Sequence, residues 1–143
     1  MDIDKIFGLF DNNLTGTSLG DLAETIDNVR DTPEFKVGMF TKIIMDHLNF
    51  NQKVIDFFTK TNNELDREDI TKAGEFVIYN RSWYYIKDID LKNKKHWYAL
   101  EKMANPKTLR AIDLSIMFFE KREEYERCAH LMKISKSIYN FIK

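Results

Sequence analysis

The sequence predicts an all-α protein, and its turn content and its apolar periodicity both support this fold class. The chain of 143 residues has only 5 glycines and 2 prolines, which is few for the many turns of a β-sandwich or barrel. Apolar residues recur at helical spacing along most of the chain. We therefore predict a single domain over residues 1–143, a bundle of about six helices in which a C-terminal helical hairpin packs on a central aromatic helix.

Two short helices are predicted near the N-terminus. Residues 1–10 form a short amphipathic segment. Ser18 followed by Asp21 resembles a capping box, which predicts a second short helix to about Val29.

A stronger start signal follows at Thr32-Pro33, where threonine suits the N-cap and proline suits the first helical position. Apolar residues then continue at helical spacing, so we expect one long helix that ends near Lys60.

The central element is the aromatic stretch Glu75–Ile89. One apolar stripe has the i, i+3, i+7, i+10 spacing of a helix face and consists of Phe76, Tyr79, Trp83 and Ile86. Val77 and Tyr84 add a second stripe beside it, which predicts a helix that is contacted on much of its circumference.

An α+β fold with a β-hairpin at 76–86 is the alternative, because the aromatic and β-branched residues here also favour strands. Asn80-Arg81 would then be the two-residue turn. Such turns favour glycine at the second position, where φ is positive, so arginine fits poorly and the helix is favoured.

The last third of the chain begins with a polar connection at 90–95 and a short predicted helix at 96–104. Asn105-Pro106 is a second N-cap and N1 signal, and helical spacing continues from it to Phe119. The charged cluster 120–124 then interrupts the apolar stripe. Since no glycine or proline forces a turn there, a hairpin and one long bent helix both remain open, with the hairpin favoured.

The composition also bears on the compartment. A single cysteine, Cys128, excludes an internal disulfide and suggests a reducing environment. No apolar run approaches the roughly 18–20 residues of a membrane span. We expect a soluble, cytoplasmic protein without a membrane partner.

No catalytic, metal or cofactor site is predicted, and no small-molecule ligand is indicated. The run that begins at Asp88 starts like a calcium loop, but its fifth and sixth positions are Lys92 and Asn93, where an oxygen ligand and glycine are needed. Cys128 and His130 lack a second ligand pair for zinc. The chain has no glycine-rich phosphate loop and no nucleophile elbow.

The charge distribution singles out one candidate surface. Residues 76–110 carry 8 basic and 3 acidic side chains, whereas residues 1–32 carry 2 basic and 7 acidic ones. Lysines mixed with aromatic rings are typical of surfaces that bind single-stranded nucleic acid. In the alternative interpretation Trp97 and Leu100 anchor a short helix in the core and the lysines are merely solvated. The candidate surface consists of Lys87, Lys92, Lys94, Lys95, His96, Trp97, Tyr98 and Lys102.

The closing run Leu109–Ile134, LRAIDLSIMFFEKREEYERCAHLMKI, resembles the C-terminal helix pair of small uncharacterised proteins encoded by tailed phages. The resemblance covers roughly a fifth of the chain and includes no functional motif. It implies a regulator or accessory factor that acts on host or phage machinery in the host cytoplasm.

Two functions are therefore carried forward. The first is a non-enzymatic module that binds another protein, with a second copy of itself as one candidate. The alternative is a nucleic-acid-binding accessory protein that uses residues 87–110. Burial of Trp83 together with exposure of Trp97 is expected if the central stretch belongs to the core and the surface lies downstream of it.

Overall fold

The computed structural model describes residues 19–61 and 67–143, and this part of the chain contains six α-helices and no strand. The helices are α2 Leu19–Arg30, α3 Pro33–Thr61, α4 Arg67–Ile86, α5 Lys94–Met103, α6 Pro106–Lys121 and α7 Tyr125–Ile142. The all-α prediction is confirmed. The alternative hairpin at 76–86 is wrong, because α4 continues as a helix through Asn80-Arg81. The predicted helix at 1–10 and the Ser18 cap lie outside the described residues.

The helices begin where side chains can cap them. At the start of α3, Phe35 donates its backbone N–H to Thr32 Oγ1 at 3.3 Å. At the start of α6, Thr108 donates its N–H to Asn105 Oδ1 at 2.8 Å, and Pro106 occupies the first turn. Both predicted start signals are thus confirmed, and each cap satisfies a backbone donor that has no partner within the helix.

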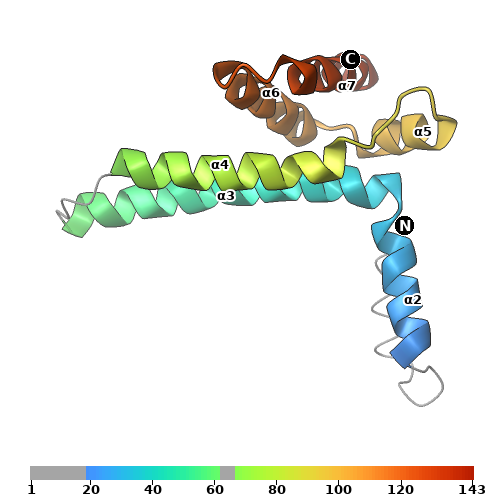
Figure 1. Cartoon of the computed structure of the whole chain (residues 1–143), viewed down its shortest axis with the longest axis horizontal. Helices are drawn as coiled ribbons and strands as arrows, with labels where there is room; N and C mark the ends of the chain where they lie inside the picture. Colours follow the sequence, from blue (N-terminus) through green and yellow to red (C-terminus); the bar gives the residue numbers. More distant parts are fainter. Residues whose placement is uncertain (1–18, 62–66) are drawn as a thin grey trace.

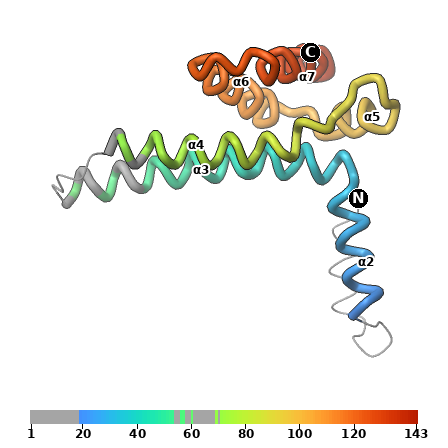
Figure 2. The backbone as a smooth tube through the Cα atoms, in the orientation of Figure 1, coloured from blue at the N-terminus to red at the C-terminus, as the bar shows by residue number. Residues whose placement is uncertain are grey.

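The two longest helices, α3 and α4, run side by side in opposite directions and form a projecting arm (Figures 1 and 2). Helices α5, α6 and α7 gather over one end of this arm, and α2 extends away from the start of α3. Below, "the arm" means α3 and α4 together. Its longer member, α3, contacts α4, α5 and α6.

The C-terminal segment is a helical hairpin and not one bent helix. The turn lies at Arg122–Glu124, where Glu123 has a φ of 60°, in the left-handed region. Glu124 donates its N–H to the Phe119 carbonyl oxygen at 3.0 Å, which closes the turn. Helices α6 and α7 then pack against each other along their length.

Aromatic rings join this hairpin to α4, as the sequence predicted. The Tyr79 ring stacks on Phe118 at a centroid distance of 4.7 Å. The Trp83 ring meets Phe119 edge to face at 5.9 Å, and Phe119 is fully buried. Contacts of this kind add about 0.5–1.5 kcal/mol each to the stabilisation by area burial. The core contains Val37, Phe40, Ile44, Tyr79, Ile86, Ile89, Leu100, Ala111, Ile112, Phe119, Cys128, Leu131, Ile134 and Ile138.

The expectation that α4 is contacted on much of its circumference is wrong. Val77 is 58% exposed and Tyr84 is 63% exposed. The two residues are seven apart and share one face of the helix, which the neighbouring helices leave open. The second apolar stripe of α4 is therefore surface. None of the helices in the described part of the chain is long and apolar enough to cross a membrane.

Candidate functional site

The predicted basic surface is formed by the connection after α4 and by α5. The four lysines at 92, 94, 95 and 102 are exposed, and Tyr98 is exposed beside them. Within residues 19–61 and 67–143 none of these four ammonium groups has an ion-pair partner. Their positive charge is therefore available to a partner molecule.

The connection itself is held by Asp90. Its Oδ1 accepts the backbone N–H of Lys92 at 3.0 Å, and its own N–H donates to His96 Nδ1 at 2.9 Å. Because Nδ1 accepts this hydrogen bond, it carries no proton, and the ring braces the connection. His96, which was predicted as a surface residue, is only half-exposed and has this structural role.

The start of α5 has an unusual charge arrangement. Asn93 caps the helix by accepting the N–H of Lys95 at 2.9 Å. The first turn contains Lys94 and Lys95 and no acidic residue. Helix N-termini carry partial positive charge, so each lysine there is disfavoured by roughly 0.3–1 kcal/mol. The positive potential of the two lysines adds to that of the helix end, and an anion close to it would be stabilised.

The aromatic part of the surface is less open than predicted. Trp97 is 38% exposed, but its ring meets Phe141 edge to face at 5.0 Å and 82°. The Trp97 and Tyr98 rings are also nearly perpendicular, at 84°. Two perpendicular rings do not offer parallel faces to successive bases. Trp83 is partly buried against the core, so the two tryptophans differ in the expected direction, although by less than expected.

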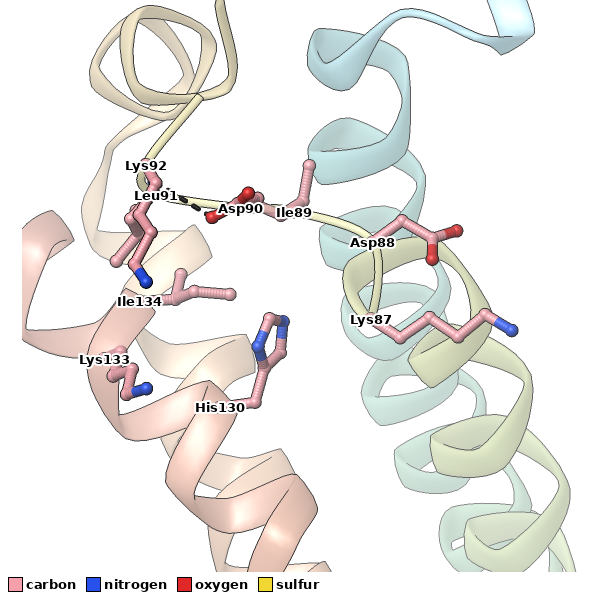
Figure 3. Close-up of a pocket in the computed structure, with 9 residues that line it drawn as sticks. All are labelled: Lys87, Asp88, Ile89, Asp90, Leu91, Lys92, His130, Lys133 and Ile134. Carbon is pink, nitrogen blue, oxygen red and sulfur yellow. Dashed lines mark hydrogen bonds between the residues drawn. The ribbon is translucent and has the colours of Figure 1, made fainter. Parts of the chain in front are cut away.

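A cavity lies between the 87–92 connection and α7, with a volume of about 320 Å³ (Figure 3). It brings part of the predicted surface together with side chains from α7 that do not belong to that surface. His130 and Lys133 are more than 35 positions away from Lys92 along the chain, and no local motif links them. The lining residues are Lys87, Asp88, Ile89, Asp90, Leu91, Lys92, His130, Lys133 and Ile134.

Two of these charged side chains extend away from the cavity (Figure 3). Lys87 places its Nζ 4.7 Å from the centroid of the Tyr84 ring. Asp88 places a carboxylate oxygen 4.0 Å from the Nζ of Lys36 on α3. Lys87 therefore does not act together with the lysines of α5, and the predicted surface divides into an α5 part and a cavity part.

The arm carries a separate apolar surface. On α3, Phe50 is 62% exposed and Phe57 is 58% exposed, and the two are seven residues apart. On α4, Val77 and Tyr84 have the same spacing and similar exposure. A seven-residue spacing keeps side chains on one helix face, as in coiled-coil seams. Each helix of the arm therefore has a heptad-spaced pair of apolar side chains that are more than half exposed.

The geometry gives no support to nucleophilic or metal chemistry in the described part of the chain. Burial raises the pKa of the Cys128 thiol, as do Glu120 and Glu124. Its sulfur lies 3.6 Å from the Ile116 carbonyl oxygen. A reactive cysteine needs the opposite, a lowered pKa and an electropositive setting. Among residues 19–61 and 67–143 no group of three or more His, Cys, Asp or Glu side chains is placed to hold a metal ion.

No family model, no curated protein and no solved structure matches this chain. The comparisons therefore give no evidence for the predicted resemblance to phage accessory proteins.

Proposed function

We propose that the chain is a non-enzymatic protein-interaction module that binds its partner through the arm, and that this partner is a second copy of the chain. The observation that carries the proposal is the pair of heptad-spaced apolar positions on each helix of the arm, Phe50 with Phe57 and Val77 with Tyr84. Exposed aromatic residues grouped in this way are typical of interaction surfaces.

The shape of the arm is compatible with self-association. The half of α3 that follows His47 lies beside α4 and away from α5, α6 and α7, so a partner can approach it there (Figure 1).

The charges on α3 are also compatible with a second copy. Lys42 and Asp46 pair with each other at 3.1 Å, and the remaining exposed charged side chains are Lys53, Asp56 and Lys60. These three alternate in sign, so Asp56 of one copy can meet a lysine of the other when two arms pack in antiparallel orientation.

The solution mass tests this proposal. Light scattering should give twice the 17.0 kDa mass of the chain at micromolar concentration. The double variant Phe50→Glu, Val77→Glu should return the mass to 17.0 kDa, because an interface core disfavours unpaired charge. The matched control is Tyr139→Glu, which places the same charge at a 57% exposed ring on α7 and should leave the dimer intact.

A monomer at all concentrations would show that self-association is wrong. A dimer that persists in the double variant would show that the arm is not the interface. If the monomeric wild type captures a protein that the double variant does not capture, the arm binds a different partner.

Nucleic-acid binding is the second candidate function, favoured by the unpaired lysines at the start of α5. Single-stranded RNA or DNA should bind at low salt, and Lys92→Ala, Lys94→Ala, Lys95→Ala together should abolish retardation. If all three contact phosphates, the slope of log K against log salt should fall by about 2. Lys136→Ala, which removes one exposed charge from α7, should change little. Failure to retard either nucleic acid at low salt would remove this candidate.

A role as a phage regulator that acts on host machinery stays a prediction from the sequence resemblance. The proposal for the arm does not depend on it.

A further inference from the structure

The cavity between the 87–92 connection and α7 contains positive charge that its neighbours do not neutralise. Lys92 and Lys133 line it, both are exposed, and neither has an ion-pair partner within the described chain. Figure 3 shows both ammonium nitrogens on the same side of the His130 ring.

The two acidic residues of the lining do not form ion pairs with its lysines Lys92 and Lys133. Asp90 accepts the backbone N–H of Lys92 at 3.0 Å and so fixes the connection. Asp88 extends away from the cavity toward Lys36, at 4.0 Å. Neither carboxylate pairs with the ammonium groups of Lys92 or Lys133.

His130 is held in place by its ring contacts. Its Nε2 lies 2.9 Å from the Ile86 carbonyl oxygen. A carbonyl oxygen can only accept, so Nε2 carries the proton and Nδ1 is the remaining polar atom of the ring. The Trp83 ring meets the imidazole edge to face at 5.5 Å, which limits its rotation. As an acceptor, Nδ1 can receive a hydrogen bond from a P–OH group.

The rest of the lining sets the size and polarity of a ligand. A volume of about 320 Å³ is at the lower end of the range for small-molecule sites. Ile89 and Ile134 are each only 1% exposed and offer little surface to a ligand, whereas Leu91 is partly exposed and contributes apolar surface. The cavity therefore has room for a phosphate group and a small organic substituent.

We propose that this cavity binds a small phosphomonoester. Lys92 and Lys133 hold the phosphate by charge, His130 adds a directed hydrogen bond, and the organic part lies against Leu91. Lysine ammonium groups bind phosphate as point charges, and they need no bidentate geometry. The site shares no residue with the apolar pairs of the arm, so failure of the arm proposal leaves it unaffected.

An NMR titration with inorganic phosphate, followed by glycerol phosphate, tests this site. The backbone amides of Leu91 and Ile134 and the His130 ring should shift with one saturable curve, and glycerol phosphate should bind more tightly. Lys133→Met and Lys92→Met should each raise the Kd about tenfold, the effect of one lost charge-assisted hydrogen bond. Lys94→Met is the matched control, because it removes the same charge just outside the lining, and its Kd should stay that of the wild type.

Three results would overturn the proposal: no saturable shift at His130, an equal loss of affinity in Lys94→Met, or acetate binding as tightly as phosphate. A single-stranded oligonucleotide could shift the same residues although glycerol phosphate shifts none of them. The cavity would then bind the phosphates of a nucleic acid, and the proposal of a small phosphomonoester would be wrong. Far-UV circular dichroism monitors folding, and Lys133→Met alone decides the matter if Lys92→Met unfolds.

Discussion

Two helical glycines of α3 and α4 allow the packing of the arm to be tested quantitatively. A Cβ atom added at Gly38 would lie 3.2 Å from Met103 Cε, and one added at Gly74 would lie 3.1 Å from His47 Cε1. Both distances are shorter than ordinary contacts by a few tenths of an ångström. Replacing a helical glycine by alanine gains up to about 1 kcal/mol at each position. The sign of each substitution therefore depends on how easily the neighbour moves.

The two neighbours differ in stiffness. Cε is the free end of the flexible Met103 side chain, which can change its rotamer at little cost. His47 is buried, its Nε2 is bonded to the Asn51 side-chain amide at 3.0 Å, and its ring meets Tyr79 edge to face. Overpacking against a fixed group costs about 1–3 kcal/mol. We expect Gly38→Ala to stabilise the fold by about 0.5–1 kcal/mol and Gly74→Ala to destabilise it by about 1 kcal/mol.

Urea unfolding measures both changes in the free energy of unfolding, provided that the dependence of this free energy on urea concentration has the same slope in all variants. The thermal midpoints of the two variants should differ by about 4–8 °C. The two variants serve as controls for each other, because both replace a helical glycine by alanine and gain the same helix propensity. A Gly74→Ala variant more stable than the wild type would refute the claim that His47 is fixed. A destabilised Gly38→Ala would refute the claim that Met103 yields.

Three further predictions concern the helix caps and the buried titratable groups. Asn105→Ala should lower the free energy of unfolding by about 1 kcal/mol in urea denaturation, because the Thr108 N–H loses its cap. Burial lowers the pKa of His47, and the charge of Glu75 offsets only part of this effect. As pH falls, the unfolded state therefore takes up a proton on His47 at a higher pH than the folded state does. Stability should then decrease as pH falls below about 6.5, and urea midpoints of His47→Gln should show less of this decrease. Burial, and then Glu75, raise the pKa of Tyr79 to about 12. Stability should therefore decrease as pH rises above about 10 toward 12, and a flat difference between wild type and Tyr79→Phe over this range would contradict the assignment.

The parts of the fold that the sequence predicted well are those with local causes. The starts of α3 and α6 follow from Thr32-Pro33 and Asn105-Pro106, where a cap and a proline act within one turn of helix. The preference for a helix at 76–86 also rested on a local fact, the poor fit of Arg81 to a tight turn.

The turn between α6 and α7 was harder to predict. It depends on Glu123 in the left-handed region, which glutamate seldom adopts, so no residue type marks it. Periodicity likewise showed that α4 has two apolar stripes but could not show which stripe has a neighbour. Val77 and Tyr84 are exposed because no helix of the described chain covers them.

The candidate sites were partly accessible from the sequence. The lysines of the α5 region form one continuous segment, so their charge was visible. The cavity was not, since His130 and Lys133 reach it through the return of the C-terminal hairpin toward the 87–92 connection. Long-range packing of this kind leaves no signal in a single sequence.

The position of α3 in the molecule has a consequence for folding cooperativity. Its first half is enclosed: Gly38 lies against Met103, and Thr41 Oγ1 donates to Thr108 Oγ1 at 3.4 Å. The half beyond His47 lies beside α4 along the arm, away from the helices at the other end (Figure 1). Amide hydrogens near Phe40 should therefore exchange only when the whole core opens, whereas those near Phe50 can exchange through a smaller opening of the arm. One continuous helix would then belong to two cooperative units, and binding at the arm would slow exchange in only one of them.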